Sequence, residues 1–304
     1  MARMKIRKKA EQRSVSRTLF SQAQLNRPLG RVAYWSSFWV MIVLFALVFL
    51  FPLYWMATGG LKSAQEFIQV PPTLVPTHPQ LSNYSTAWTD VDLGRLLFNT
   101  TLYAGGALLF QLVFDIGAAY AFSKLRPALG NVILFMMLAT LMIPATVLVL
   151  PEYLTANNIP FLHWSLLNSP WVIWLPSVTN AFNIFLLKRF FDSIPEELLA
   201  AAAIDGAGPL RALWSVILPM SRPILGVVSI FAVVNVWKDF LWPLLVLTNT
   251  SAQTVNVGLN QLSVGLPENI FIAALAIASV PTIVFFLIFQ RNIMSGLTAG
   301  SLKG

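Results

Sequence analysis

The sequence contains no cysteine and very little charge. Of its 304 residues only 11% are charged, whereas soluble globular domains carry about 25% charged residues. The missing cysteines exclude disulfide bonds and thiolate metal sites. The two histidines, His78 and His163, fall in expected loops, so we expect no metal centre. The scarcity of charge indicates a membrane protein.

In place of charge the chain has long apolar runs. Hydrophobic residues make up 57% of it, and charge-free runs such as 32–61 and 269–290 exceed the roughly 20 residues that a helix needs to cross a bilayer. Lipid offers the backbone no hydrogen-bond partners, so such runs form helices. We therefore predict an all-α polytopic membrane protein with six transmembrane helices. The six predicted spans are 34–57, 95–121, 131–150, 168–190, 223–247 and 268–291.

Positive charge is distributed unevenly around these spans. Of the 20 Lys and Arg residues, 17 fall on one side of the predicted arrangement, and nine of these lie in the N-terminal tail, 1–33. Lys and Arg collect on the cytoplasmic side of membrane proteins. We expect both termini and the polar segment 192–219 to be cytoplasmic. The basic tail suits anionic lipid, and no nucleic-acid motif accompanies it, so we expect no nucleic-acid partner.

The polar segment 192–219, between the fourth and fifth spans, is too interrupted by Gly and Pro to cross a bilayer. It includes the sequence IPEELLAAAAIDGAGPLRALWSVILP. Alanine and leucine favour a helix, Ser193 with Glu196 predicts a capping box, and Gly206 predicts the helix end. A second short helix is expected at about 210–217. Such a surface helix suits either a cleft in another protein or the lipid headgroups.

This segment resembles the "EAA" signature of the membrane subunits of bacterial ABC importers, which in the sugar-importer branch has the form I-P-x-E-L-x-E-A-A-x-I-D-G-A. Other stretches are similar to the second permease of maltose-type carbohydrate importers. These are NT at 99–100, AAYAFSKLRP at 118–127, MIP at 142–144, WKDFLWPL at 237–244 and GLTAGSLKG at 296–304. The resemblance implies one importer transmembrane domain over 34–304, with only the tail 1–33 outside it.

The resemblance implies the permease subunit of an ATP-driven sugar importer in a bacterial inner membrane, with no catalytic residue and no cofactor of its own. The implied partners are a second permease, two ATPase subunits that bind ATP and Mg²⁺, an extracytoplasmic sugar-binding protein and the lipid bilayer. The segment 192–219 would hold a cytoplasmic coupling helix that moves with the ATPases as a lever.

The coupling residues that the resemblance implies lie along this helix and just beyond it. They are Glu196, Glu197, Leu198, Ala200, Ala201, Ala202, Asp205, Gly206, Ala207, Leu218 and Pro219. Two positions depart from the family pattern. Ala200 stands where the family has a glutamate thought to pair with a basic residue of the ATPase, and Lys238 stands where the family usually has Asn.

Three charged residues, Asp115, Lys238 and Asp239, fall within predicted spans, where charge is costly and marks candidate functional sites. Neighbouring residues on a helix point about 100° apart, so Lys238 and Asp239 cannot share one face. Together with Asn235 and Trp237 they are candidates for a substrate pathway, because aromatic rings stack on sugars and polar groups hold hydroxyls. Helix packing or gating explains them as well. For Asp115 we expect interhelical hydrogen bonding or subunit packing.

Two other functions stay open at this point. An ion-coupled secondary transporter could use Asp115 or the Lys238–Asp239 pair, but that class predicts inverted repeats, no clear repeat is present, and residues 194–207 would have no purpose. A non-transporting membrane scaffold would leave the charges inside the spans without a role.

Overall fold

The computed structural model describes residues 28–299, with side chains described to residue 290, and this part is helical without a strand. The all-α prediction is therefore confirmed for the described residues. The basic tail predicted at 1–33 lies outside them up to residue 27. Residues 1–55 and 56–304 form two separate units, which we describe one at a time.

The first unit is dominated by the long apolar helix α3 (Pro28–Gly59), which continues into the start of the second. It begins at Pro28, earlier than the predicted span. Large apolar side chains such as Leu47 and Phe49 are exposed along it. A helix that is apolar on all sides suits lipid as its surroundings.

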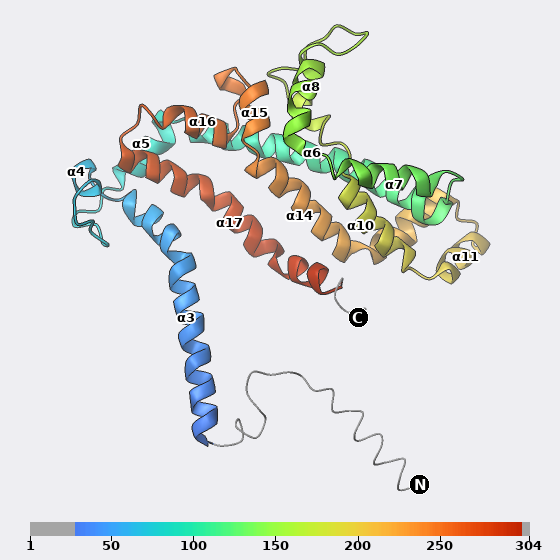
Figure 1. The fold of residues 1–304 in the computed structure, drawn as a ribbon, viewed down its shortest axis with the longest axis horizontal. Coiled ribbons are helices and arrows are strands. Elements are labelled where there is room, and N and C mark those ends of the chain that lie inside the picture. The colour runs from blue at the N-terminus through green and yellow to red at the C-terminus, as the bar shows by residue number, and fades with distance from the viewer. Residues whose placement is uncertain (1–27, 300–304) are drawn as a thin grey trace. The chain divides into compact units, whose positions relative to one another are not determined.

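The second unit begins with the turn α4 (Ala64–Phe67) and the helix α5 (Ser82–Asp90), both between the first two predicted spans. The remaining helices are α6 (Leu93–Tyr120), α7 (Gly130–Thr140), α8 (Ala145–Asn157), α9 (Trp171–Trp174), α10 (Ala181–Asp192), α11 (Glu196–Ile204), α12 (Pro209–Ala212), α13 (Leu218–Met220), α14 (Arg222–Lys238), α15 (Leu241–Val246), α16 (Val255–Leu262) and α17 (Glu268–Ala299) (Figure 1). Two π-helical turns, η1 (Ala121–Leu125) and η2 (Leu213–Ile217), and one 3₁₀ turn, η3 (Thr250–Ala252), complete it.

Three of the described helices are long and apolar enough to cross a membrane: α3, α6 with η1, and α17 as far as Gln290. Two bent pairs would each make one more span. These are α7 with α8, bent by 101°, and Pro209–Met220 with α14, bent by 85°. The described residues thus supply three to five spanning elements.

Three of the six predicted spans are not continuous helices. The span at 131–150 is divided between α7 and α8, the span at 223–247 is divided between α14 and α15, and the third is the span at 168–190. It is divided into α9 and α10 by a non-helical break at 175–180. Pro176 lies in this break, and proline has no backbone N–H with which to continue a helix. An apolar composition predicts residence in the membrane, but it does not exclude a break of this kind.

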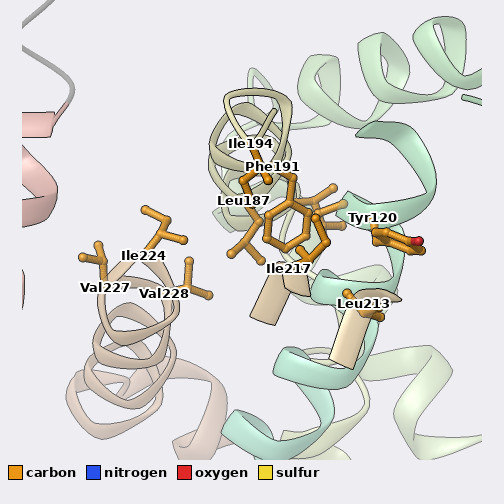
Figure 2. Packing of buried hydrophobic residues seen from close by; sticks show 11 residues of the cluster. Tyr120, Leu187, Phe191, Ile194, Leu213, Ile217, Ile224, Val227 and Val228 are labelled. Atoms are coloured by element: carbon orange, nitrogen blue, oxygen red, sulfur yellow. The ribbon is translucent and has the colours of Figure 1, made fainter. Parts of the chain in front are cut away.

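Helix α6 is the centre of the second unit, since α5, α9, α10, α14 and α16 all pack against it. At its C-terminal end a cluster of buried apolar side chains joins α6 to α10, η2 and α14. Figure 2 shows Tyr120, Phe191, Ile217 and Val228 in this cluster. The cluster attaches the segment 192–219 to the central helix.

One close approach on α6 requires glycine. A Cβ atom on Gly106 would lie 2.2 Å from Cε2 of Trp174, far inside van der Waals contact. Because Gly106 leaves this space, the indole of Trp174 lies on α6 and its Nε1 donates to the carbonyl of Tyr103 over 3.2 Å. The short helix α9 is positioned in this way.

Candidate functional site

Helix α11 forms where the sequence predicts it and has no buried residue. Six of the predicted coupling residues lie on it: Glu196, Glu197, Leu198, Ala200, Ala201 and Ala202. The helix is stabilised by its run of alanine and leucine, yet Leu198 and Ile204 are 41% and 86% exposed. An apolar helix left this open at the surface can bind a partner.

The C-terminal end of α11 is closed by a Schellman motif. Gly206 takes a left-handed φ of 79°, which glycine adopts without strain. Its N–H donates to the carbonyl of Ala203 over 3.0 Å, and the N–H of Ala207 donates to the carbonyl of Ala202 over 2.9 Å. These two bonds define the motif. The predicted site residues Asp205, Gly206 and Ala207 therefore fix the direction in which the chain leaves the helix.

The predicted capping box at the N-terminal end is wrong. Pro195 occupies the cap position, and no side chain caps the helix. The Oγ of Ser193 instead donates to the carbonyl of Phe190 over 2.6 Å, while the carboxylate of Glu196 pairs with Arg126. A tertiary ion pair has replaced the local bond, because the chain returns to α6 at this point.

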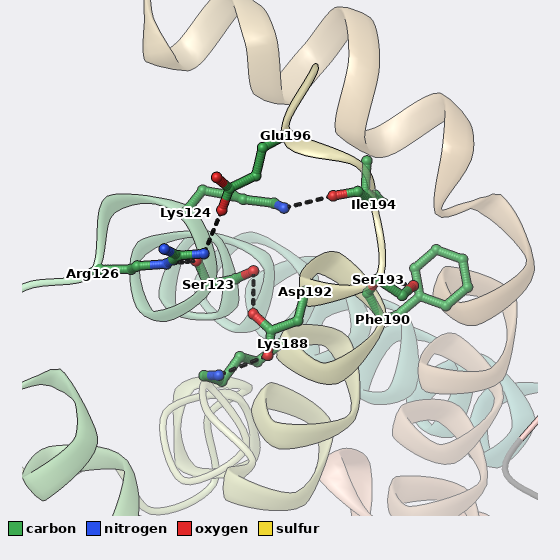
Figure 3. Close-up of polar contacts among 9 residues, drawn as sticks. All are labelled: Ser123, Lys124, Arg126, Lys188, Phe190, Asp192, Ser193, Ile194 and Glu196. Carbon is green, nitrogen blue, oxygen red and sulfur yellow. Dashed lines mark hydrogen bonds and ion pairs between the residues drawn. The ribbon is translucent and has the colours of Figure 1, made fainter. Parts of the chain in front are cut away.

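A network of polar contacts ties the start of α11 to the end of α6 (Figure 3). Nη2 of Arg126 lies 2.5 Å from Oε1 of Glu196, and Nζ of Lys124 donates to the carbonyl of Ile194 over 2.9 Å. Oγ of Ser123 donates to Oδ1 of Asp192 over 2.7 Å. We call Ser123, Lys124, Arg126, Lys188, Asp192 and Glu196 the anchor network.

Within the anchor network, Asp192 accepts hydrogen bonds from two side chains. Burial would raise the pKa of its carboxyl, but hydrogen bonds from Lys188 and Ser123 and the nearby charge of Lys124 hold that pKa below its usual value. Nζ of Lys188 lies 2.8 Å from Oδ2 of Asp192. The ionised carboxylate therefore joins α10 to the end of α6.

A further contact holds the other side of the segment. The hydroxyl of Tyr120 donates to the carbonyl of Pro209 over 3.0 Å, at the start of α12. From there η2 leads into α13, where the predicted coupling residues Leu218 and Pro219 lie. The segment 192–219 is thus fixed to α6 before and after α11, while α11 itself remains exposed.

An apolar surface extends from α11 over the following turns. Leu210 and Trp214 are 73% and 71% exposed, and with Leu198 and Ile204 they make four large apolar side chains that the segment exposes. We call these four residues the docking patch. Together with the anchor network it makes the segment an exposed helix on a firm base.

The four substrate-pathway candidates do not form one site. Asn235 and Asp239 line a cavity of about 120 Å³ with residues of α9, α15 and α16. Trp237 and Lys238 line a different, largely apolar cavity of about 300 Å³ against α17. Lys238 and Asp239 thus line different cavities, and Asp239 has an extended backbone just beyond the end of α14.

Asp115 is fully buried on α6 and contacts the break in the predicted fourth span. Its Oδ1 accepts the backbone N–H of Asn180 over 3.0 Å, and the side chain of Asn180 in turn caps Asn183 at the start of α10. The break at 175–180 leaves N–H groups without helical partners, and the carboxylate accepts one of them. This geometry is that of interhelical hydrogen bonding.

The anchor network is the part of the site that sequence reasoning missed. Lys124, Arg126 and Lys188 enter the sequence argument only as charges that set orientation. The partners of Lys124 and Arg126 lie 70 positions away along the chain, and no local motif marks such a pairing. Lys188 pairs with Asp192 four positions on, a local spacing whose link to Ser123 only the fold shows. Among the described residues, no group of three or more His, Cys, Asp or Glu could hold a metal ion.

The described residues form an all-helical membrane protein in which an exposed helix is fixed to the central helix α6. A family described as "Binding-protein-dependent transport system inner membrane component" matches residues 115–298. The chain belongs to this family, and the resemblance to importer permeases is confirmed. Membership favours an importer subunit over an ion-coupled transporter or a scaffold.

Individual relatives cover most of the chain. It is 34% identical to the sulfoquinovosyl glycerol transport system permease protein SmoH of Agrobacterium fabrum, over 84% of this chain and 89% of the relative. It is 30% identical to the sn-glycerol-3-phosphate transport system permease protein UgpE of Yersinia enterocolitica, over 85% and 94%. The diacetylchitobiose uptake system permease protein NgcG of Streptomyces coelicolor is 29% identical, over 86% and 87%.

A solved structure has the same fold. It is the crystal structure of a bacterial ABC transporter involved in the import of the acidic polysaccharide alginate, and its matching chain superposes with a TM-score of 0.77. The match covers 90% of this chain and 99% of that chain at 24% identity. At this identity the likeness is one of fold.

Proposed function

We propose that the chain is the transmembrane permease subunit of an ATP-driven importer for a sugar or polyol, forming half of the translocation pathway. The observation that carries this proposal is α11, an exposed, capped helix anchored to α6 at the position of the EAA-like sequence. The compounds for which the three relatives are named, sulfoquinovosyl glycerol, glycerol 3-phosphate and diacetylchitobiose, all carry hydroxyl groups.

In this proposal α11 is a coupling helix that docks in one of two ATPase subunits. ATP and Mg²⁺ bind to those subunits, and their closure moves α11. The anchor network passes the movement to α6, which packs against most of the second unit. A second permease completes the pathway, and an extracytoplasmic binding protein delivers the ligand.

The chemistry of the docking surface follows from its residues. Alanine at position 200 supplies no carboxylate, and Glu196 is engaged with Arg126. The remaining acidic side chain on α11 is the exposed Glu197. We expect the docking patch to supply most of the contact with the ATPase, and Glu197 to supply its charge.

The membrane arrangement completes the proposal. We place six spans in the bacterial inner membrane by counting the broken pair α9 and α10 as the fourth. Both termini and α11 are then cytoplasmic, which agrees with the excess of Lys and Arg on that side.

The test is purification of the tagged chain from its native host in detergent, identification of co-purifying subunits, and assay of ATPase activity in lipid. Gly206→Pro and Asp205→Arg disturb the cap of α11, and Gly208→Ala is the matched control because a Cβ atom at Gly208 meets no atom within 4 Å. We expect a second permease and an ATPase to co-purify, and the first two variants to lose or uncouple the ATPase. A chain that purifies without an ATPase, with transport indifferent to these changes, would contradict the proposal.

A further inference from the structure

The cavity of about 120 Å³ beside α14 has a polar lining that the coupling function does not use. Ser177, Asn235, Asp239, Trp242 and Thr254 line it, and three apolar residues complete the wall. A water occupies about 30 Å³ of liquid volume, so the cavity holds a few waters or a three-carbon polyol. It is too small for a whole disaccharide.

Thr254 provides the evidence that this cavity takes a ligand. The residue is 2% exposed, and within the described part of the chain its Oγ1 has no hydrogen-bond partner. Buried hydroxyls are nearly always paired. The other polar groups of the lining differ, since Ser177 Oγ donates to the carbonyl of Ile173 over 2.8 Å and Trp242 Nε1 donates to the carbonyl of Val172 over 2.9 Å.

The ionisable residue in the wall of this cavity is acidic, Asp239. Two charged side chains outside the wall interact with it electrostatically: Glu152, in the wall of a neighbouring cavity, and Lys238, in the wall of the cavity against α17. A carboxylate accepts hydrogen bonds from hydroxyl groups, and it repels a phosphate, sulfonate or uronate.

We propose that this cavity is a subsite for the hydroxyl groups of a neutral sugar or polyol. Thr254 and Asn235 exchange hydrogen bonds with the ligand, Asp239 accepts from its hydroxyls, and the ring of Trp242 covers its carbon atoms. This inference rests on the proposed function and deepens it, because it gives this chain its own contact with the ligand and a preference for an uncharged one.

The absence of cysteine from the chain allows a direct test. Ser177→Cys is nearly isosteric and places one thiol in the cavity wall while leaving Thr254, Asn235 and Asp239 intact. In membranes containing the full importer, we would measure its rate of modification by a small methanethiosulfonate reagent. The probes are glycerol and glucose, with glycerol 3-phosphate as the anionic match to glycerol. Thr282→Cys, in the wall of the other cavity, is the control thiol.

We expect glycerol or glucose to slow modification of Ser177→Cys about tenfold at ten times its dissociation constant. Glycerol 3-phosphate at the same concentration should change the rate less than about twofold, since the carboxylate opposes its charge. Adding Thr254→Val should raise the protecting concentration roughly three- to tenfold, the effect of one hydrogen bond. The control thiol should not respond.

Two results would overturn the inference. If neither neutral probe protects the thiol, the cavity is a water site. If glycerol 3-phosphate protects as well as glycerol, the preference for an uncharged ligand is wrong. Co-purification of the ATPase distinguishes failure of this inference from failure of the proposed function. If the importer assembles with its ATPase but no probe protects the thiol, only the subsite is contradicted. If a probe protects the thiol but no ATPase binds the chain, the proposed function is contradicted and the subsite is supported.

Discussion

The two ends of helix α6 hold their neighbours by different kinds of bond. At the C-terminal end, the anchor network combines bonds between side chains with a bond from Lys124 to the carbonyl of Ile194, and its Arg126–Glu196 pair is 65% and 67% exposed. At the N-terminal end, side chains of α6 bind backbone carbonyls of residues 250–253. There the polar groups are mostly buried, and an ion pair joins Arg95 to Asp92 in the first turn of the helix.

The N-terminal end is the more firmly fixed. Nδ2 of Asn99 donates to the carbonyls of Ser251 and Gln253 over 2.8 and 3.0 Å, and the hydroxyl of Tyr103 donates to the carbonyl of Ala252 over 2.7 Å. The N–H of Val255 donates to Oγ1 of Thr100 over 2.9 Å. Thr254 lies inside this set, so the bonds hold the wall of the polar cavity in place.

The difference suits two tasks. Exposed ion pairs contribute between about 0 and 1 kcal/mol each, and they can re-form after movement. Buried backbone groups that lose their partners cost about 1–3 kcal/mol each, so the contacts at residues 250–255 resist movement. If the two proposals hold, one end of α6 follows the ATPase and the other keeps the wall of the proposed subsite rigid.

The largest effect on stability should come from breaking the hydrogen bonds at the N-terminal end of α6. Asn99→Leu leaves the carbonyls of Ser251 and Gln253 unpaired, and we expect a loss of about 2–4 kcal/mol in the free energy of unfolding. Thermal unfolding of the purified protein measures it. Thr101→Val is the control, because its hydroxyl bonds only to Leu97 on the same helix. Equal melting temperatures for the two variants would contradict the account.

A substitution in the C-terminal cap of α11 should have a smaller effect on stability. Gly206→Ala places a Cβ atom at a left-handed φ, which costs about 1–2 kcal/mol, and amides of α11 should exchange roughly tenfold faster. Hydrogen exchange followed by mass spectrometry measures this. Gly208→Ala, at a φ of −70°, should leave exchange unchanged, and similar exchange in both variants would refute the role of the cap.

The exposed ion pair should affect coupling more than stability. Arg126→Glu or Glu196→Arg should change the free energy of unfolding by less than about 1 kcal/mol, yet lower the ATPase activity coupled to transport because α11 loses a contact with α6. The double variant restores opposite charges and should recover activity. If it recovers nothing, the pair does not transmit movement.

The smallest effect is a dependence on pH. The pKa of Asp192 is lowered in the folded protein by Lys188 and Ser123, so its ionised form stabilises the fold above the unfolded pKa of about 3.9, and this stability disappears as pH falls through the folded pKa. The difference in melting temperature between wild type and Asp192→Asn should be constant above about pH 5 and narrow below about pH 4. A difference in melting temperature that changes between pH 6 and 8 would contradict the assignment of this pH dependence to the Asp192 carboxylate.

Much of the coupling segment could be predicted from sequence, because its signals are local. A run of Ala and Leu ended by Gly206 predicts both the helix α11 and its end. The helical class follows equally from the apolar runs. Local signals failed where a distant group competed with them. Glu196 forms an ion pair with Arg126 instead of the predicted capping box.

The remaining errors also concern distant partners. Residues 168–190 are apolar enough for a span, but Asp115 on another helix accepts the N–H that the break exposes. Asn235, Trp237, Lys238 and Asp239 are neighbours in sequence, and only the packing of α15 and α17 against α14 separates them into two cavities.

Cross-linking from α11 is the most direct test of whether this helix docks in an ATPase subunit. Ile204→Cys gives the chain a single, exposed thiol, and a bifunctional thiol reagent would be applied to the purified importer. The account predicts a cross-link to an ATPase subunit from this position and none from Leu262→Cys, which lies on α16 among the elements that pack on the N-terminal half of α6. A thiol at position 204 that reaches no ATPase subunit, or reaches it no better than position 262, would contradict the account.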